Sequence, residues 1–416
     1  MFTVVTNQLK HLVYNCKINI VYFCNKQIMC MNLPYIYTNY KEEALFGRYI
    51  TNEHIEPLLG VLRKTFTVDI IGNSVEGLPI YSILAGAGPV KVFIWSQMHG
   101  NESTTTKALF DFLNFLASED NVAQDFKQNF TFYILPIVNP DGARLYTREN
   151  ANKVDLNRDS VALSQPESKL LRDAFENFKP DYCYNMHDQR TIFGVGDKPK
   201  PATVSFLAPS YNEGREVNAV RQKAINLIVA MNKTLQHYIP GQVGRFDDSF
   251  NINCIGDMLQ SLNVPTVLFE AGHYQNDYER EETRKFVFFA LYSGIYAINE
   301  NVLVLDAIEE YFNIPQNKII FYDMMYKKVK IYYENKEKIT NFAAQYKEVV
   351  FDKSVIFRAF IREIGNSEVC FGHAEFDCNE EEFAGINGSY LPVNDMEADF
   401  YIGKNRKFIN GTEVFE

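Results

Sequence analysis

The sequence predicts an α/β protein with a mixed, mostly parallel sheet covered by helices on both faces, followed by a small, mostly β C-terminal domain. Two observations lead to this fold class. Between residues 51 and 301, short apolar segments alternate with segments whose apolar residues recur at every third or fourth position, as in βαβ units. After about residue 304, the segments are short, rich in β-branched and aromatic residues, and separated by turns.

The first predicted strands form a hairpin and a buried neighbour. FTVDIIG (66–72) and LPIYSILAG (78–86) are joined through NSVEG, whose Asn, Ser and Gly favour a turn. VKVFIWS (90–96) is a continuous apolar run, as expected for a strand covered on both faces. TTTKALFDFLNFLA (104–117) follows with apolar residues at helical spacing.

The rest of the chain continues these two patterns. NFTFYILPIV (129–138) is predicted as a strand and 165–178 as a helix, with Pro166 in the first turn, where its missing N–H is tolerated. The next elements are strands at 181–187 and 203–209, a helix at 213–238, a strand at 264–272 and a helix at 278–298. Beyond them, short strands are predicted in NKIIFYD, KVKIYYE, EVVFD, VIFRAFI and ADFYIG.

These patterns divide the 416-residue chain into an N-terminal extension (1–44), partly disordered, an α/β domain (45–303) and a β-rich domain (304–416). INIVYFC is too short to span a bilayer and no export signal is recognisable, so we expect a cytoplasmic protein without a membrane span. The seven cysteines are odd in number and lack paired spacing, which fits reduced thiols. A net charge of −11 without a basic stripe argues against a nucleic-acid partner.

A histidine and a glutamate lie three residues apart directly after the strand predicted at 90–96. The stretch QMHGNEST places His99 just past that strand and Glu102 at the approach to the next helix. Strand ends of α/β sheets deliver side chains into the crevice where these folds bind ligands. Imidazole and carboxylate are zinc ligands, and a catalytic zinc takes three protein ligands and one water. The pair therefore indicates a zinc site, although a His-x-x-Glu spacing taken alone is better explained as the cap of a helix.

The third ligand should come from another strand end, and two histidines meet this condition. His187 closes DYCYNMH, and His273 follows the strand that ends in FEAGH. We prefer His187, because Glu270 on the other strand has a role of its own. A carboxylate at the end of a buried strand is costly unless it is paired or acts as an acid or base. We therefore predict Glu270 as the general base and acid, with a structural salt bridge as the alternative.

Several motifs occur in an order that resembles the zinc carboxypeptidase family, of the carboxypeptidase A type. They are HGNE (99–102), NPDGAR (139–144), TRENANKVDLNRD (147–159), YNMH (184–187) and FEAG (269–272), and IGNSVEGLPIY (71–81) resembles the family's early hairpin. The similarity covers roughly residues 45–300, and the ordered set is far more specific than any single motif. It implies the zinc carboxypeptidase fold and a metallocarboxypeptidase, in a bacterial-looking member.

The resemblance implies a role for each residue of the metal centre. His99, Glu102 and His187 would hold one zinc ion per chain, and Glu270 would move the proton during hydrolysis. Asp155 would contact His99 and orient its ring, as zinc-bound histidines usually require.

Other positions are implied to contact the substrate. Arg148 would stabilise the oxyanion of the tetrahedral intermediate, and Asn157 with Arg158 would bind the terminal carboxylate. Family members carry a tyrosine on a loop that closes over the substrate before the glutamate. The corresponding RFDDSFNINCIGD (245–257) has Phe246 and Phe250 instead, which removes a hydrogen bond to the substrate and leaves an apolar lid.

The resemblance leaves the substrate open. The first reading is a zinc-dependent hydrolase that cleaves an amide bond next to a free carboxylate, in a peptide or an acyl-amino acid. Alternatives are an N-acyl amino acid deacylase, an amidase of peptidoglycan stem peptides, or a non-catalytic ligand-binding relative. The last would lack a zinc ligand or the base, and the sequence lacks neither. Arg190 and Asp257 are candidates to line the pocket for the terminal side chain.

Overall fold

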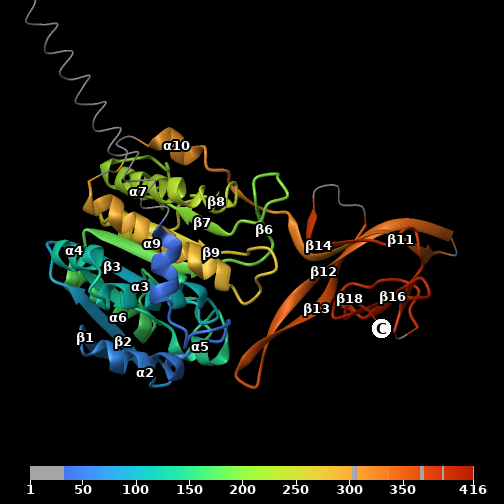
Figure 1. The fold of residues 1–416 in the computed structure, drawn as a ribbon, viewed down its shortest axis with the longest axis horizontal. Helices are drawn as coiled ribbons and strands as arrows, with labels where there is room; N and C mark the ends of the chain where they lie inside the picture. Colours follow the sequence, from blue (N-terminus) through green and yellow to red (C-terminus); the bar gives the residue numbers. More distant parts are fainter. Residues whose placement is uncertain are drawn as a thin grey trace, which may run out of the picture.

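The computed structural model describes residues 32–415, apart from 302, 304–306, 335, 366–369 and 387. Figure 1 shows an α/β part and, beside it, a β-rich part formed by the end of the chain. The predictions made for the first thirty residues lie outside the described residues. Within the described part of the chain, no helix combines the length and apolar character that a membrane crossing requires.

The α/β part is built on a central eight-stranded sheet in the order β1-β2-β4-β3-β5-β9-β7-β8. Its strands are β1 (Thr67–Asn73), β2 (Pro79–Gly86), β3 (Val90–Ser96), β4 (Phe130–Leu135), β5 (Tyr182–Asp188), β7 (Val204–Leu207), β8 (Val243–Arg245) and β9 (Thr266–Ala271). Neighbours β4, β3, β5 and β9 run parallel, as do β7 and β8. The pairs β1–β2, β2–β4 and β7–β9 are antiparallel, so the sheet is mixed and mostly parallel, as predicted.

Helices cover both faces of this sheet, which confirms the predicted fold class (Figure 1). They are α2 (Asn52–Leu62), α3 (Thr104–Ala117), α4 (Asn121–Asn129), α5 (Pro140–Leu145), α6 (Pro166–Phe178), α7 (Ala219–Leu235), α8 (Ile255–Ser261) and α9 (Glu281–Asn299). Alternate residues of β3 explain the two cores: Val92 and Ile94 pack in the cluster with α3, α7 and α9, whereas Phe93 and Trp95 pack with α6 and α8. A run that is apolar at every position therefore belongs to a strand buried on both faces.

Some predicted element ends were wrong, and local chemistry explains why. The strand predicted to end at 138 stops at Leu135, before Pro136, which cannot donate a ladder hydrogen bond. The helix predicted from 213 begins only at Ala219, because the Asn218 side chain accepts from the N–H groups of Val220 and Arg221 as an N-cap.

Residues just before the predicted start of the α/β domain pack into its core. A helix over residues 32–40 precedes α2. Leu33, Ile36 and Tyr37 of this helix lie in the same hydrophobic cluster as α3 and α9. Part of the segment described above as an extension therefore belongs to the α/β core.

The C-terminal part contains two four-stranded sheets, as expected for a mostly β domain. The first, in the order β13-β12-β11-β14, consists of β11 (Phe321–Tyr333), β12 (Lys336–Phe351), β13 (Ser354–Ile364) and β14 (Phe371–Asp377). The second consists of β15 (Phe383–Gly385), β16 (Phe400–Ile402), β17 (Arg406–Ile409) and β18 (Thr412–Val414). A short helix, α10 (Ile308–Phe312), and the two-stranded pair β6 (Phe193–Val195) and β10 (Asn317–Ile319) link the two parts of the chain.

The β-rich domain packs against the α/β part through specific polar and aromatic contacts. Glu348 on β12 forms an ion pair with Arg48 at 3.0 Å. The ring of His373 on β14 lies 4.1 Å from the ring of His273, which follows β9. The C-terminal domain therefore contacts the segment before α2 and the segment after β9.

Candidate metal centre and active-site cleft

The sequence-predicted site residues gather at the carboxyl ends of three parallel strands. His99 follows β3, His187 lies near the end of β5, and Glu270 lies near the end of β9. Because β3, β5 and β9 are adjacent and parallel, their carboxyl ends meet at one edge of the sheet. His187 and Glu270 are direct register partners across β5 and β9.

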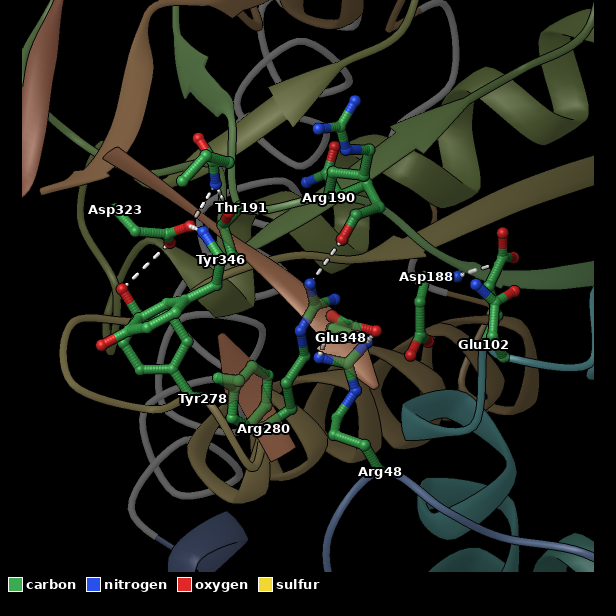
Figure 2. Close-up of a pocket in the computed structure, with 14 residues that line it drawn as sticks. Arg48, Glu102, Asp188, Arg190, Thr191, Tyr278, Arg280, Asp323, Tyr346 and Glu348 are labelled. Carbon is green, nitrogen blue, oxygen red and sulfur yellow. Dashed lines mark hydrogen bonds and ion pairs between the residues drawn. The ribbon is translucent and has the colours of Figure 1, made fainter. Parts of the chain in front are cut away.

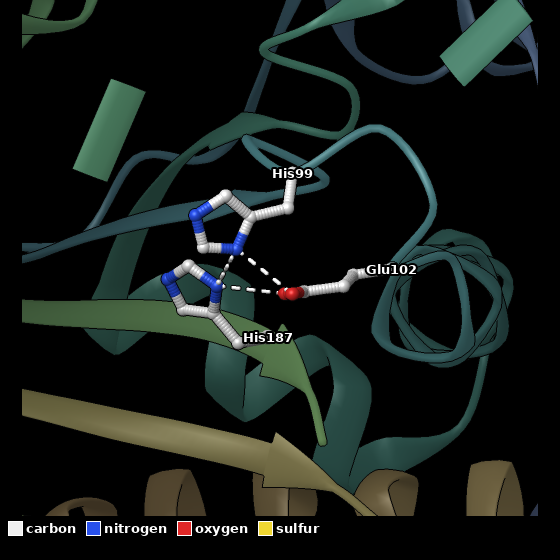
Figure 3. A group of neighbouring side chains, drawn as sticks. All are labelled: His99, Glu102 and His187. Carbon is white, nitrogen blue, oxygen red and sulfur yellow. Dashed lines mark hydrogen bonds and ion pairs between the residues drawn. The ribbon is translucent and has the colours of Figure 1, made fainter. Parts of the chain in front are cut away.

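His99, Glu102 and His187 form a buried cluster of possible metal ligands (Figure 3). Nδ1 of His99 lies 2.8 Å from Oε1 of Glu102, Nδ1 of His187 lies 2.8 Å from Oε2, and the two Nδ1 atoms are 3.1 Å apart. Tetrahedral zinc with bonds of about 2.0–2.1 Å would set its ligand atoms about 3.3 Å apart. Two imidazoles and a carboxylate therefore converge at nearly the spacing that zinc requires.

The second ring nitrogen of His99 contacts Asp155, which the sequence had suggested as its orienting partner. Nε2 of His99 lies 3.0 Å from Oδ1 of Asp155. A proton on Nε2 would leave the lone pair of Nδ1 facing the cluster, which is the tautomer that a metal needs. Although burial raises the pKa of Asp155, its contacts with His99 and Arg148 hold that pKa well below the usual value. Asp155 is therefore ionised and suited to accept this proton.

The backbone around the cluster explains two of the sequence motifs. A Cβ on Gly100 would lie 1.9 Å from the carbonyl carbon of Gly142, so the HGNE and NPDG loops pack backbone against backbone. Asn139 fixes this contact, because its Oδ1 accepts from the N–H of Gly142 and its Nδ2 donates to the carbonyl of Met98. The NPDG motif thus supports the loop that carries His99.

Glu270 faces the same cleft with a free acceptor. Its Oε2 atom is buried and has no hydrogen-bond partner among the described residues. Burial raises the pKa of Glu270 well above its usual value, and the nearby charges of Glu102 and Asp188 act in the same direction. A carboxylate that holds a proton readily and lacks a structural partner is suited to proton transfer.

The cleft that these residues share has a volume of about 680 Å³. Arg148 stands at its edge, with Nη1 3.3 Å from Oε1 of Glu102 and Nη2 3.0 Å from Oδ2 of Asp155. Asn157 and Arg158 also line the cleft. Oδ1 of Asn157 accepts from the N–H of Ile255, which leaves its amide N–H groups for other partners.

Arg158 retains a guanidinium that can bind an anion. Its Nη1 donates to the carbonyl of Asn157, and it forms no ion pair with the described acidic residues. Its acidic neighbour Asp159 instead accepts hydrogen bonds from Ser164 and Gln165. The local ion pair that the flanking sequence would allow is therefore absent.

The second candidate ligand, His273, lies elsewhere. It contacts His373 and Tyr278 through its ring and does not join the cluster of possible ligands. Phe246 and Phe250 both line the cleft, in the stretch where the family's tyrosine was missing.

Other residues of the cleft were not predicted as site residues. Asn185 and Leu268 line it, each two positions before a site residue on the same strand. Alternate residues of a strand share a face, so Asn185 could have been predicted from His187, and Leu268 from Glu270. Arg190 and Asp257, the two candidates for the terminal side-chain pocket, line the cleft as well.

The chain is similar to several known carboxypeptidases. Residues 62–222 match the family model described as zinc carboxypeptidase. Carboxypeptidase SOL1 from Arabidopsis thaliana is 27% identical over 201 residues, which cover 40% of this chain and 41% of that protein. Carboxypeptidase 2 from Trichophyton tonsurans is 29% identical over 100 residues, covering 24% and 19%. The chain thus spans less than half the length of these curated relatives.

A solved structure shows the same fold. A protein from Shewanella denitrificans OS-217 that is provisionally assigned as carboxypeptidase A superimposes with a TM-score of 0.52 at 17% identity, over 62% of this chain and 70% of that one. The fold is that of this neighbour, and the His-Glu-His cluster is a donor set suited to zinc. Residues 62–222 are therefore similar to the zinc carboxypeptidase family, as the motifs suggested.

Proposed function

We propose that this protein is a zinc-dependent hydrolase that cleaves an amide bond next to a free carboxylate, a metallocarboxypeptidase with one zinc per chain. The observation that supports this most directly is the meeting of the ligand cluster, the unpartnered Oε2 of Glu270 and the guanidinium of Arg158 in one cleft. The substrate would be a peptide or acyl-amino acid with a free terminal carboxylate.

The residues fit the metal. Two imidazole nitrogens and a carboxylate are a donor set that catalytic zinc uses, and Asp155 supports one imidazole from behind. His99, Glu102 and His187 would hold the ion. When bound, zinc lowers the pKa of water and polarises the carbonyl of the bond to be cleaved.

The remaining residues would divide the work of hydrolysis. Asn157 and Arg158 bind the terminal carboxylate, so that the adjacent amide bond lies over the cluster. Oε2 of Glu270 accepts a proton from the attacking water and later donates it to the leaving amine. The guanidinium of Arg148 places positive charge where the oxyanion develops.

The test compares peptides that differ only in their terminus. A panel of dipeptides and N-acyl amino acids with free carboxylates is incubated with the zinc-loaded protein, with and without a chelator. Each is paired with its C-terminal amide. Cleavage of the acids, inhibition by the chelator and a loss of about a hundredfold or more for the amides are expected, since the Arg158 contact is lost. Equal cleavage of acids and amides would contradict the assigned carboxylate site.

The same panel addresses the other candidates. N-acyl amino acid deacylation and cleavage of peptidoglycan stem peptides would appear as a preference for those substrates over ordinary dipeptides. Zinc binding without any hydrolysis would support a ligand-binding relative. Carboxypeptidase SOL1 and carboxypeptidase 2, two of the matching relatives, are carboxypeptidases by name, so we retain carboxypeptidase activity as the proposal.

A further inference from the structure

A second cavity, of about 220 Å³, lies between the cleft and the β-rich domain (Figure 2). Glu102, Asp188, Gln189 and Arg190 line both cavities, so the two spaces adjoin across the end of β5. The far wall comes from the C-terminal domain, through Asp323 on β11, Gln345 on β12 and Phe357 on β13. The volume lies below the range of about 300–1,000 Å³ typical of sites for drug-sized ligands, so it suits a single side chain.

The cavity contains a buried positive charge that is in ion-pair contact with none of the described carboxylates. Arg280 is 1% exposed, and its guanidinium donates only to the backbone carbonyls of Ala271 and Gln189. It forms no ion pair with the described acidic residues, and its Nε atom has no hydrogen-bond partner among them. Buried charges in proteins are normally paired, but the carboxylates of Asp188 and Glu348 act on this guanidinium without ion-pair contact, so it can take a closer anion.

Two further arginines have spare donors in the same cavity. Nε of Arg48 is also buried without a partner, although its terminal nitrogens bind Glu348. Arg190 is exposed and has no hydrogen bond or ion pair with any described residue. Figure 2 shows the side chains of Arg48 and Arg280 next to each other in the cavity. Burial lowers the pKa of Arg280 and the charge of Arg48 acts in the same direction, whereas the carboxylates of Asp188 and Glu348 oppose the shift.

The carboxylates of the cavity are already satisfied, so they offer little to a cationic ligand. Glu348 binds Arg48 and the hydroxyl of Tyr146. Asp188 accepts from the N–H groups of Thr104 and Thr105 at the start of α3.

The same holds for the two other acidic side chains. Asp323 accepts from the hydroxyl of Tyr278, and Glu102 belongs to the ligand cluster. The groups that remain available to a ligand are the hydrogen-bond donors of the arginines and the unpartnered Oε1 of Gln345, which could accept from an amide N–H. The available groups favour an anion attached to a peptide-like frame.

The position of the cavity relative to the cluster tells which part of a substrate could enter it. Asn157 and Arg158, the proposed carboxylate site, line the large cleft and do not line the small cavity. A substrate whose terminal carboxylate lies at Arg158 and whose amide bond lies at the cluster would continue past Glu102 on its acyl side.

We propose that the small cavity binds a carboxylate on the acyl side of the scissile bond, held by Arg280 and Arg48, while the exposed Arg190, whose guanidinium points away from both in Figure 2, adds positive charge nearby. This rests on the proposed function and names its substrate class: peptides with an acidic residue directly before the terminal one. The β-rich domain then takes part in substrate selection, since it closes the cavity.

The test uses the zinc-loaded full chain and a matched pair of peptides, N-acetyl-Glu-Ala and N-acetyl-Gln-Ala. They differ only in the acyl-side charge. Turnover is measured with the wild type, and binding is measured by calorimetry on E270Q, so that binding can be read without cleavage. We expect the Glu peptide to be preferred by about ten- to hundredfold in kcat/KM and in affinity, as for a charged hydrogen bond in a buried site.

Variants locate the effect. R280Q should bring the preference to near unity. R190Q changes an exposed side chain, so the fold should persist, and it should reduce the preference by a smaller factor. K353Q removes the exposed ion pair of Lys353 with Glu53 at 3.0 Å, away from the cavity, and should leave the preference unchanged.

The outcomes separate the two proposals. Equal use and equal binding of the two peptides by the wild type would overturn the cavity proposal while leaving carboxypeptidase activity intact. A preference that persists in full in both R280Q and R190Q would overturn it as well. Binding preference without any cleavage would support the cavity and refute the proposed function.

Discussion

Replacing Glu270 by glutamine should nearly abolish hydrolysis while leaving the metal in place. Glutamine has the shape of glutamate and cannot accept a proton from water at neutral pH. Among the buried carboxylate oxygens of the cleft in the described chain, Oε2 of Glu270 is the one without a partner. E270Q therefore removes a proton acceptor without breaking a structural hydrogen bond at that atom.

The expected size of the effect follows from the role. A positioned general base contributes about 10²- to 10⁴-fold, equivalent to about 3–5 kcal/mol in the activation barrier. Folding should not suffer, because burial already raises the pKa of Glu270 and so disfavours its charged form. Zinc should stay, because His99, Glu102 and His187 are unchanged.

Three measurements on the same preparation decide the matter: kcat/KM on the best peptide of the panel, zinc per chain by elemental analysis, and the melting temperature. E279Q is a suitable control, because burial also raises the pKa of Glu279 but that side chain lines neither cavity. Ordinary turnover in E270Q, with zinc bound, would refute the assignment of the base. Loss of zinc in E270Q would instead show that Glu270 is a ligand.

Three other predictions follow from the same contacts. H187A should lose zinc, whereas H273A should keep it, which elemental analysis of the two purified variants would show; the reverse result would move the third ligand to His273. R158Q should raise KM for acid substrates by about tenfold or more with little change for the amides, and an equal effect on both would contradict its role. Burial lowers the pKa of His373 to about 4 and also lowers the pKa of His273, and the charge of Arg280 acts in the same direction. As the pH falls, the unfolded chain therefore binds protons at these histidines at a higher pH than the folded protein does. The free energy of unfolding should therefore fall as the pH drops from about 6.5 towards 4, by at most about 3 kcal/mol for His373. Denaturant titrations at several pH values should show a smaller fall in H373Q, and an unchanged fall would exclude this histidine as the cause.

The order of the motifs was enough to predict the fold class and to bring the site residues together. His99, His187 and Glu270 each follow or end an apolar run, and in a parallel sheet such ends meet at one edge. What the sequence could not decide was the choice between His187 and His273. That choice depends on strand order: β5 lies directly between β3 and β9, and this neighbourhood is set by long-range packing.

His273 lies outside the cluster because it comes after the end of β9. A Cβ on Gly272 would lie 1.9 Å from the carbonyl oxygen of Ala202, so β9 ends against the neighbouring segment. His273 then points to the β-rich domain, where it meets His373. The sequence shows a histidine after a strand in both cases and contains no local signal for this difference.

The second cavity could not be predicted from the sequence at all. Arg48 lies before α2, Arg280 directly precedes α9, and Glu348 lies on β12, 300 positions after Arg48. None of the three is in a recognisable motif, and each alone is most simply explained as a surface charge. Only the packing of the β-rich domain buries them together.

The end of β5 connects the two cavities physically. The backbone N–H of Asp188 donates to Oε2 of Glu102 at 3.1 Å, and its carboxylate accepts from the N–H of Thr104 at the start of α3. One residue further on, the carbonyl of Gln189 accepts from Arg280. A carboxylate bound at Arg280 therefore lies two hydrogen-bonded steps from a proposed zinc ligand. If an acidic residue on the acyl side changes kcat more than KM, we expect this short chain of contacts to connect the bound carboxylate with the zinc ligand. Comparing the change in kcat with the change in KM caused by R280Q would measure this effect.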